Sequence, residues 1–322
     1  MQAIQVFQKA ILIEIEKLPI QGNPDELYEP IRYILQLGGK RLRPVLTLMA
    51  ADAFGNWQDA IPAALSVEVF HNFTLVHDDI MDEAPLRRGK ETVHHKWDVN
   101  RGILSGDAML VKAYQILASQ EKGDLASLLK VFNQTALEVC EGQQLDVNFE
   151  DRDDVSESDY IEMIRLKTSV LLGAALQLGA IVSGASESDQ HHLYNYGVQM
   201  GIAFQIKDDM LDVYGDPEKV GKQVGGDILA NKKTLLMLHA IKTASGNEAT
   251  QLRRWLATTD SSSEKVTEVT AIFNMTGAKE AAEKVIQDFY QSALKELDET
   301  SLSPDKKQLF LDFASWLMDR DY

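Results

Sequence analysis

The chain is organised around residues 69–88, which read VFHNFTLVHDDIMDEAPLRR. An apolar helical run ends there in an acidic DDxxD motif, whose first and last carboxylates belong to Asp78 and Asp82. In a helix these two side chains share one face and lie about 5–6 Å apart. Two like charges so close repel each other, but the pair suits a hard cation such as Mg²⁺, which keeps several waters and also binds phosphates. One such motif alone is weak support for a metal site.

The same pattern returns in residues 204–212, FQIKDDMLD, where Asp208 and Asp212 share a helical face between apolar flanks. A single DDxxD is usually a solvated acidic turn. Two of them, each in an otherwise apolar helix, require a counter-charge, because buried unpaired carboxylates are costly. The sequence therefore predicts metal ions between two facing helices, with Asp78, Asp82, Asp208 and Asp212 as the metal-binding residues.

Composition describes an ordinary globular protein of one large domain or two, with 322 residues, 45% of them hydrophobic and 25% charged. The net charge of −17 argues against nucleic acid and anionic membranes as partners. Cys140 is the only cysteine, which excludes an internal disulfide and a thiolate metal cage, and its apolar neighbours predict a buried side chain. The N-terminal stretch lacks the features of a secretion signal, so a cytoplasmic location is expected.

Helical periodicity dominates the chain, and no strand-like alternation is present. Residues 168–186 carry no charge, but Gln177 and several glycines and hydroxyl residues within them favour a core helix over a membrane span. We therefore expect an all-α protein without stable membrane insertion. Four glycines in residues 215–226 predict mobility or close approach of the backbone to a ligand, not a dinucleotide fingerprint, because no βαβ spacing surrounds them.

Basic residues gather at a few places in this acidic chain. The turn GGKRLRP, residues 38–44, would be a solvated connection between helices if it stood alone. Opposite carboxylate-bound metals, its cations Lys40 and Arg43 are better interpreted as an anion site. Arg87 and Arg88 follow the first motif and can fork toward phosphate oxygens. His71 lies two helical turns before Asp78 on the same face, and its alignment predicts a phosphate donor although a lone apolar-face histidine is more often a core residue.

The turn, the two DDxxD motifs and GGDILANKKT at residues 225–234 together resemble the trans-isoprenyl diphosphate synthases, the polyprenyl synthetase family. These enzymes join isopentenyl diphosphate to an allylic diphosphate such as dimethylallyl, geranyl or farnesyl diphosphate. The resemblance covers nearly the whole chain. It implies a single domain over residues 1–322, an all-α helical bundle of the isoprenoid synthase type around a deep central cavity, with the two motifs facing each other at its mouth. It also implies a homodimer.

Site residues carry over from the family by position. Lys40, Arg43 and His71, with Arg88 beside them, match the isopentenyl diphosphate site, and Asp78 and Asp82 match the first Mg²⁺ pair. Arg87 matches an allylic diphosphate contact, Asp208 matches the second metal site, and Asp212 closes that motif. The remaining allylic-site positions are matched by Lys167, Thr168, Gln205, Lys222 and Lys232. The catalytic set implied by the resemblance is Asp78, Asp82, Arg87, Lys167, Asp208 and Lys232, so nothing indicates a non-catalytic subunit.

The implied chemistry agrees with the mixture of carboxylates and cations. Ionisation of an allylic diphosphate leaves a carbocation and a highly charged leaving group, which Mg²⁺, arginines and lysines must neutralise. The resemblance implies that isopentenyl diphosphate then attacks the cation and loses a proton to the released pyrophosphate. The cavity must be dry, because water would quench the cation.

Product length is expected to depend on Phe73, five residues before Asp78, with Phe70 one turn below it. Both could simply be core residues. In the family, a large aromatic residue at the position of Phe73 forms the pocket floor of short-chain enzymes. The uninterrupted DDIMD lacks the two extra residues of bacterial farnesyl synthases and resembles the archaeal geranylgeranyl pattern. We therefore predict geranylgeranyl diphosphate as the product, with farnesyl diphosphate as the alternative.

Three other classes of protein deserve comparison. Glu68-x-x-His71 and Glu91-x-x-His94 have the spacing of a ferritin-like di-iron site, but the loop of residues 85–89 interrupts the segment between them. A terpene cyclase also uses an aspartate-rich helix and Mg²⁺, but the basic turn and the second full motif argue against it. An acidic helical scaffold without activity would leave the clustered cations without a purpose.

Overall fold

The computed structural model describes residues 2–216, 225–258 and 262–319. The chain divides into two compact units, and each is described by itself below. The first unit comprises Met1–Asn133 and Ala174–Tyr194, and the second comprises Gln134–Gly173 and Asn195–Tyr322. Helices α7 (Leu125–Glu150), α9 (Val170–Val182) and α10 (Glu187–Tyr214) each contribute residues to both units. The prediction that residues 1–322 form a single domain around a deep cavity stays a prediction.

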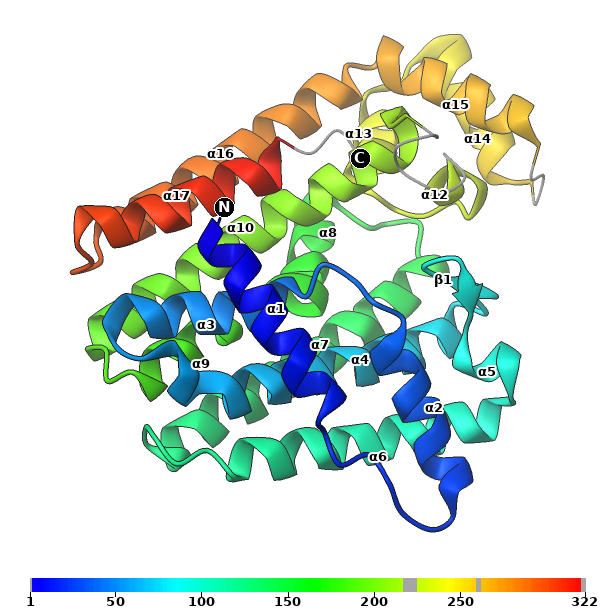
Figure 1. The fold of residues 1–322 in the computed structure, drawn as a ribbon. Helices are drawn as coiled ribbons and strands as arrows, with labels where there is room; N and C mark the ends of the chain where they lie inside the picture. The colour runs from blue at the N-terminus through cyan, green and yellow to red at the C-terminus, as the bar shows by residue number, and fades with distance from the viewer. Residues whose placement is uncertain (1, 217–224, 259–261, 320–322) are drawn as a thin grey trace. The chain divides into compact units, whose positions relative to one another are not determined.

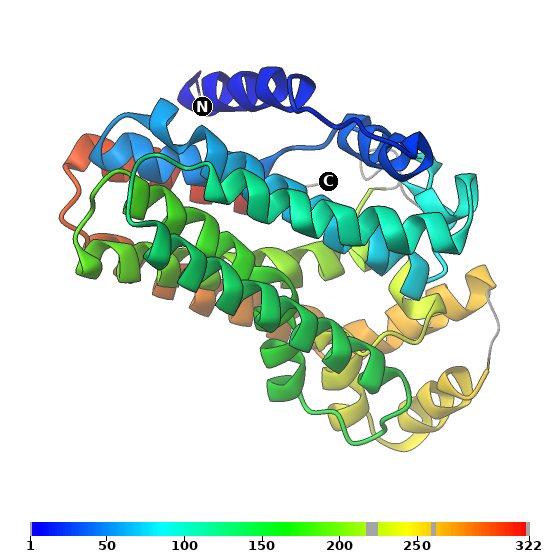
Figure 2. The same cartoon turned by 90° about the horizontal axis from the view of Figure 1, so that it is seen from below.

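The predicted all-α class is confirmed, because the only strands in the described part of the chain are two of two residues each. The first unit contains α1 (Gln2–Glu16), α2 (Asp25–Gln36), α3 (Leu42–Phe54), the 3₁₀ turn η1 (Trp57–Ala60) and α4 (Ile61–Met81). It continues with the hairpin β1 (Leu86–Arg87) and β2 (Lys90–Glu91), the short α5 (Val93–Lys96) and α6 (Val99–Ala118), which runs back along α4 (Figures 1 and 2).

Helix α4 forms the core of the first unit. Pro62 stands in its first turn, where its missing N–H costs nothing. Helices α1, α2, α3 and α6 all pack against α4. Val67, Phe70 and Val76 on different sides of the helix are at most 1% exposed, so α4 is buried nearly all round. The helical hydrogen bonds continue to Asp82, whose N–H donates to the Asp78 carbonyl at 2.8 Å, and Glu83 then leaves the helix with a φ of 48°.

The second unit surrounds the later part of α10. It contains α8 (Glu157–Ile164), the π-helical turn η2 (Arg165–Ser169), α12 (Gly226–Leu229), α13 (Leu235–Thr243), α14 (Gly246–Leu256), α15 (Ser263–Met275), α16 (Ala278–Asp298) and α17 (Pro304–Met318). Helices α16 and α17 lie side by side in both views (Figures 1 and 2). The Tyr196 hydroxyl on α10 donates to the Phe310 carbonyl on α17 at 2.9 Å. Ser156 and Asp159 form a capping box that begins α8.

Small residues let the backbones of the second unit approach closely. A Cβ atom on Gly201 of α10 would lie 2.7 Å from the Ser169 Cα atom, and one on Gly197 would lie 2.7 Å from the Gly173 Cα atom. On α7, a Cβ atom on Gly142 would lie 2.2 Å from the Lys167 nitrogen. Helices α7 and α10 therefore both press against η2 or the residues that follow it.

One segment of the described chain, Glu157–Val182, has the length and composition of a membrane span, with a mean hydropathy of 1.3 over an 18-residue window. However, 78% of that window is buried within the fold. A core helix of a globular protein can have the same length and composition, so this finding is weak support for a span. It agrees with the packing of glycines described above.

The prediction that Cys140 is buried is wrong, because its side chain is exposed. Leu137, three residues earlier on α7, is also 58% exposed, whereas Val139 is only 6% exposed. Residues three apart on a helix share a face. The apolar run around Cys140 therefore covers both the inward and the outward side of α7, and local hydrophobicity could not tell the two apart.

Candidate active site

Arg41, which was not among the predicted site residues, anchors the basic turn. Arg41 adopts a φ of 49° and turns its side chain inward, where it forms an ion pair with Glu68 of α4 and both side chains are 2% exposed. Asn72 also donates to the Glu68 carboxylate at 2.8 Å. This buried network anchors the turn on α4. Its neighbour Lys40 is exposed and Arg43 is half-buried.

Arg43 and His71, which the family resemblance assigns to one diphosphate site, lie in contact. Arg43 Nη1 lies 3.0 Å from His71 Nε2. A guanidinium can only donate, so this ring nitrogen accepts and the imidazole is neutral. Burial lowers the pKa of His71 well below its ordinary value, and the positive charges of Arg43, Arg88, Arg87 and Arg41 lower it further. A neutral His71 can donate to a substrate through Nδ1 but brings no charge of its own.

The hairpin after α4 adds Arg87 and Arg88 to the same region. Arg88 has a φ of 55° and donates from Nη1 to the Gly38 carbonyl in the basic turn. A Cβ atom on Gly39 would lie 2.7 Å from the Arg88 guanidinium carbon, so only glycine leaves room for that side chain without a shift. The structure thus places Arg88 beside the turn that carries Lys40 and Arg43.

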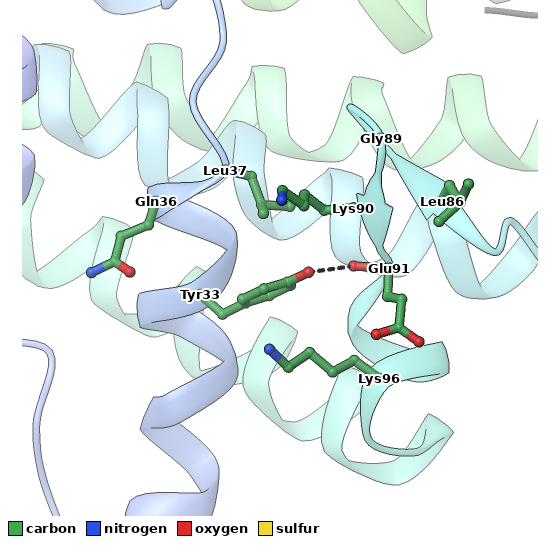
Figure 3. A pocket seen from close by; sticks show the side chains of 8 residues that line it. All are labelled: Tyr33, Gln36, Leu37, Leu86, Gly89, Lys90, Glu91 and Lys96. Carbon is green, nitrogen blue, oxygen red and sulfur yellow. Dashed lines mark hydrogen bonds between the residues drawn. The ribbon is translucent and has the colours of Figure 1, made fainter.

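Helix α2 is also tied to the hairpin. The Tyr33 hydroxyl donates to the Glu91 carbonyl at 2.8 Å, and Lys96 Nζ lies 4.1 Å from the centre of the Tyr33 ring (Figure 3). A pocket of about 500 Å³ opens here between α2 and the hairpin. The pocket is lined by Tyr33, Gln36, Leu37, Leu86, Gly89, Lys90, Glu91 and Lys96. None of these is a predicted site residue. Because α2 leads into the basic turn and β1 carries Arg87, this contact joins the two segments that supply the cations.

The carboxylates of the first motif have different environments. Asp78 is half-buried and Asp82 is exposed at the end of α4. Asp79 between them is 2% exposed at its side chain and is paired with Arg87, whose Nε lies 2.9 Å from each carboxylate oxygen and whose Nη2 lies 2.8 Å from Oδ1. Burial raises the pKa of Asp79, and the hydrogen bonds and charge of Arg87 oppose that rise.

The geometry of the first motif is compatible with a cation shared by Asp78 and Asp82, and it does not match a ferritin-like di-iron site. Asp78 and Asp82 are one helical turn apart on the outer end of α4, where hard oxygen ligands, waters and a phosphate can meet. Glu68, by contrast, is committed to Arg41 deep in the unit, which leaves no di-iron ligand at that position. Among the described residues no group of three or more His, Cys, Asp or Glu is poised to hold a metal, so a cation here also depends on ligands from elsewhere, such as a diphosphate.

The second motif has the same division of roles. Asp208 and Asp212 on α10 are half-buried. Asp209 is buried, accepts from the Tyr160 hydroxyl at 2.6 Å and accepts from Gln205 Nε2 at 2.9 Å. The Thr168 hydroxyl in turn donates to Gln205 Oε1 at 3.1 Å. Two predicted allylic-site residues, Thr168 and Gln205, are therefore in direct contact.

The π-helical turn η2 carries Lys167 and Thr168. Such turns are rare and are frequent at functional sites. Lys167 Nζ donates to Asp146 Oδ2 of α7 at 2.6 Å, with the two side chains 19% and 17% exposed. Asp146, Asp79, Asp209 and Tyr160 were all missed at the sequence level. The doubled aspartates of the two motifs were the available signal for Asp79 and Asp209.

Asp212 organises the segment that follows the second motif. Its carbonyl accepts from the Gly225 N–H at 2.6 Å, and its carboxylate accepts from the Asp227 N–H at 2.9 Å. The Lys232 N–H donates to the Asp227 carbonyl at 2.9 Å, and Lys232 Nζ lies 4.0 Å from the Asp227 carboxylate. Lys232 is thus linked to the second motif through Asp227. Lys222, another predicted site residue, lies outside the described residues.

Phe73 is part of an aromatic cluster in the first unit. The side chain is 9% exposed, and its ring centre lies 5.6 Å from that of Phe70 and 4.9 Å from that of His77. Phe70 in turn packs edge to face on Phe132 at 5.2 Å. Such a supported ring can act as a rigid wall. Its predicted role as the floor of the product pocket stays a prediction.

Comparison with known proteins defines the family. The model of the polyprenyl synthetase family matches residues 24–273. The chain belongs to this family. The "Geranylgeranyl pyrophosphate synthase" of Geoglobus acetivorans is 39% identical to this polyprenyl synthetase over 98% of its chain and 97% of the relative. The "Geranylfarnesyl diphosphate synthase" of Natronomonas pharaonis is 36% identical over 95% of this chain and 93% of the relative.

Solved structures match this polyprenyl synthetase along its whole length. A crystal structure of a geranylgeranyl pyrophosphate synthase has a TM-score of 0.94 at 50% identity, covering 98% of both chains. The geranylgeranyl pyrophosphate synthase of Corynebacterium glutamicum, complexed with isoprenyl diphosphate and magnesium, has a TM-score of 0.86 at 29% identity, covering 99% of both chains. The polyprenyl synthase of Caulobacter crescentus, complexed with calcium and isoprenyl diphosphate, has a TM-score of 0.89 at 27% identity, covering 100% of this chain and 98% of the other.

Proposed function

We propose that this polyprenyl synthetase condenses isopentenyl diphosphate with an allylic diphosphate in a Mg²⁺-dependent head-to-tail reaction and releases geranylgeranyl diphosphate. As a member of its family it is a prenyltransferase. The observation that carries the proposal is the arrangement at the end of α4. On this helix His71 contacts Arg43 two turns before the DDxxD motif, and Arg87 is paired with Asp79 of that motif.

The predicted site residues have distinct tasks in this proposal. Lys40, Arg43, His71 and Arg88 bind the diphosphate of isopentenyl diphosphate. Arg87, Lys167, Thr168, Gln205, Lys222 and Lys232 bind the allylic diphosphate. Asp78, Asp82, Asp208 and Asp212 would hold Mg²⁺, which would supply Lewis-acid charge to the leaving diphosphate. Arginine and lysine side chains hold the departing oxygens in place, and the apolar aromatic cluster around Phe73 keeps water from the reacting carbon atoms.

Geranylgeranyl diphosphate is the proposed product because the uninterrupted DDIMD motif is combined with Phe73 five residues upstream. The relative from Geoglobus acetivorans supports this assignment by its name. The relative from Natronomonas pharaonis carries the name of a longer product at nearly the same identity, so likeness alone does not select the chain length. Farnesyl diphosphate remains the shorter alternative.

Product analysis tests this proposal. The purified protein is incubated with Mg²⁺, isopentenyl diphosphate and, separately, dimethylallyl, geranyl or farnesyl diphosphate, and the dephosphorylated alcohols are sized. We expect one twenty-carbon endpoint from all three starters. A fifteen-carbon endpoint contradicts the product assignment, and no condensation with any starter contradicts the function.

Two aspartate variants test the metal assignment. Asp78→Ala and Asp208→Ala should each lower kcat by at least about a hundredfold, because each removes a carboxylate that would hold the cation stabilising the leaving group in the transition state. Asp298→Ala, which removes an exposed aspartate of α16, is the matched control and should keep full activity. Full activity in either motif variant contradicts the proposed metal site.

We further propose that the enzyme is a homodimer that buries the outer face of α6. Val99, Ile103, Leu104 and Val111 on this helix are 41% to 57% exposed. Large apolar side chains exposed together on one helix are typical of an interface, because scattered single residues are the norm on free surfaces. The second copy of the chain is the proposed occupant, in line with the symmetric assembly expected of soluble enzymes.

A further inference from the structure

The middle aspartate of each DDxxD motif has a different environment from its two neighbours. Asp79 has a side chain that is 2% exposed, and Asp209 is 6% exposed as a residue. The outer aspartates Asp78, Asp208 and Asp212 are half-buried, and Asp82 is exposed. A buried carboxylate must be matched by hydrogen bonds or charge. In both motifs a residue that is predicted to bind substrate supplies a hydrogen bond to the buried carboxylate: Arg87 to Asp79 and Gln205 to Asp209.

Asp79 controls the orientation of the Arg87 guanidinium. Arg87 Nε lies 2.9 Å from both Asp79 oxygens, and its Nη2 lies 2.8 Å from Oδ1. Such a fork fixes the plane of the guanidinium as well as its distance. The contact uses the Nε edge, so the Nη1 group points away from Asp79. The Arg87 side chain keeps 25% exposure, which leaves it accessible to an anion.

Asp209 controls the orientation of the Gln205 amide by the same logic. Gln205 Nε2 donates to Asp209 Oδ1 at 2.9 Å, while the Tyr160 hydroxyl donates to Asp209 Oδ2 at 2.6 Å. Once the amide is fixed this way round, its oxygen accepts the Thr168 hydroxyl at 3.1 Å. The Thr168 proton is then engaged with Gln205. Of the donors of Thr168 and Gln205, only the second N–H of the Gln205 amide is then left to donate to an anion.

We infer that Asp79 and Asp209 are positioning residues, which aim Arg87 and Gln205 at the allylic diphosphate, and that neither binds the metal. Both oxygens of each carboxylate accept hydrogen bonds from protein groups. The inference rests on the proposed function, since it assigns the target of Arg87 and Gln205. It divides each motif into outer carboxylates that face the cation and an inner carboxylate that faces the protein.

A double-mutant cycle on the first motif tests the inference. The variants Asp79→Asn, Arg87→Gln and the double variant are compared with the wild type for kcat and for the KM of each substrate. We expect Asp79→Asn to raise the KM of the allylic diphosphate by about tenfold, with the KM of isopentenyl diphosphate changed less than about twofold. In the Arg87→Gln background the same replacement should have no further effect, because Asp79 acts through Arg87.

Two results would overturn the role of Asp79. Additive effects of the two single variants would show that Asp79 acts independently of Arg87. A raised Mg²⁺ requirement in Asp79→Asn, with an unchanged KM for the allylic diphosphate, would identify Asp79 as a metal ligand. Asp79→Glu provides a second variant if Asp79→Asn unfolds, because it keeps the charge but displaces the guanidinium, and it should show the same selective rise in KM.

The corresponding cycle in the second unit uses Asp209→Leu and Gln205→Met, with the same measurements and the same expected lack of additivity. If Asp209→Leu unfolds, Tyr160→Phe serves instead. It removes one hydrogen bond to Asp209 and should raise the KM of the allylic diphosphate less than Gln205→Met does. An equal change in both KM values, in either variant, contradicts a positioning role for Asp209.

Binding of inorganic pyrophosphate separates this inference from the proposed function. Calorimetry of the full chain with Mg²⁺ and pyrophosphate needs no turnover. If the wild type binds pyrophosphate but makes no prenyl product, the proposed reaction is wrong, and a weaker binding of pyrophosphate to Asp79→Asn still supports the positioning role. If Asp79→Asn and Asp209→Leu bind pyrophosphate as tightly as the wild type does, the inference fails whatever the activity.

Discussion

Single residues of the same type have opposite tasks in this enzyme. Arg41 and Arg43 stand two positions apart, yet Arg41 is buried against Glu68 while Arg43 contacts His71. Asp78 and Asp79 are adjacent, yet only Asp79 is fully withdrawn from solvent. Residue type identified the charge, but the direction of the side chain decided its role. The pKa of His71 is a measurable consequence of these directions.

His71 should make the protein less stable in acid. The unfolded chain binds a proton on His71 below its ordinary pKa of 6.5, but the folded chain resists this proton because burial and the arginines lower the pKa. The unfolded state then binds more protons, so stability falls as pH falls below 6.5. The slope from this residue approaches about 1.4 kcal/mol per pH unit.

Urea unfolding of His71→Gln between about pH 7 and pH 5 checks this expectation. The variant should lose less stability over this interval than the wild type does. His191→Gln, at an exposed position of α10, is the matched control and should keep the wild-type pH dependence. An acid limb that is unchanged in His71→Gln would show that the imidazole titrates normally in the folded protein.

Elements of the second unit are positioned by close backbone contacts. Helix α7 approaches η2 at Gly142, and α10 approaches it at Gly201. The π-helical turn in η2 presents Lys167 and Thr168 to Asp146 and Gln205 from one short segment. The allylic-site residues therefore depend on how tightly the helices pack.

Gly142→Ala should destabilise the enzyme, although alanine is the better helix former. The new Cβ atom would lie 2.2 Å from the Lys167 nitrogen, a backbone atom that cannot move aside alone. Overpacking of this kind costs about 1–3 kcal/mol, against a gain of about 0.5–1 kcal/mol in helix propensity. Chemical unfolding should show a net loss, and Gln144→Ala on the exposed side of α7 should change stability by less than about 0.5 kcal/mol. A Gly142→Ala variant as stable as the wild type would contradict the close contact.

At the scale of the whole molecule, the fold is shared by relatives with diverse sequences. A decaprenyl diphosphate synthase from Rhodobacter capsulatus is 28% identical, yet its structure matches with a TM-score of 0.89.

The proposed homodimer predicts the effect of charge on α6. The double variant Leu104→Glu with Val111→Glu places charges on two side chains that are each 57% exposed. Burying unpaired carboxylates in an interface is costly, so the variant should be a monomer at micromolar concentration by light scattering. Met275→Glu on α15, where the methionine is 59% exposed, is the control and should remain dimeric. A double variant that stays dimeric would contradict an interface on α6.

Local spacing was enough to predict the helices and the shared face of Asp78 and Asp82. Helix geometry sets these relations within a few residues, so they can be derived before the chain folds. The family resemblance added the roles of residues distant in sequence, and the fold class and the family were confirmed.

Tertiary contacts alone decided which charges are buried. The pairing of Arg41 with Glu68, of Asp79 with Arg87 and of Asp209 with Tyr160 joins segments that helical spacing does not bring together. The same holds for the π-helical turn at Lys167, and for Cys140, whose exposed side depends on which face of α7 the core covers. The physical reason is that a charge is withdrawn from water only where a partner from another element arrives to match it, and that partner is chosen by the packing of the whole fold.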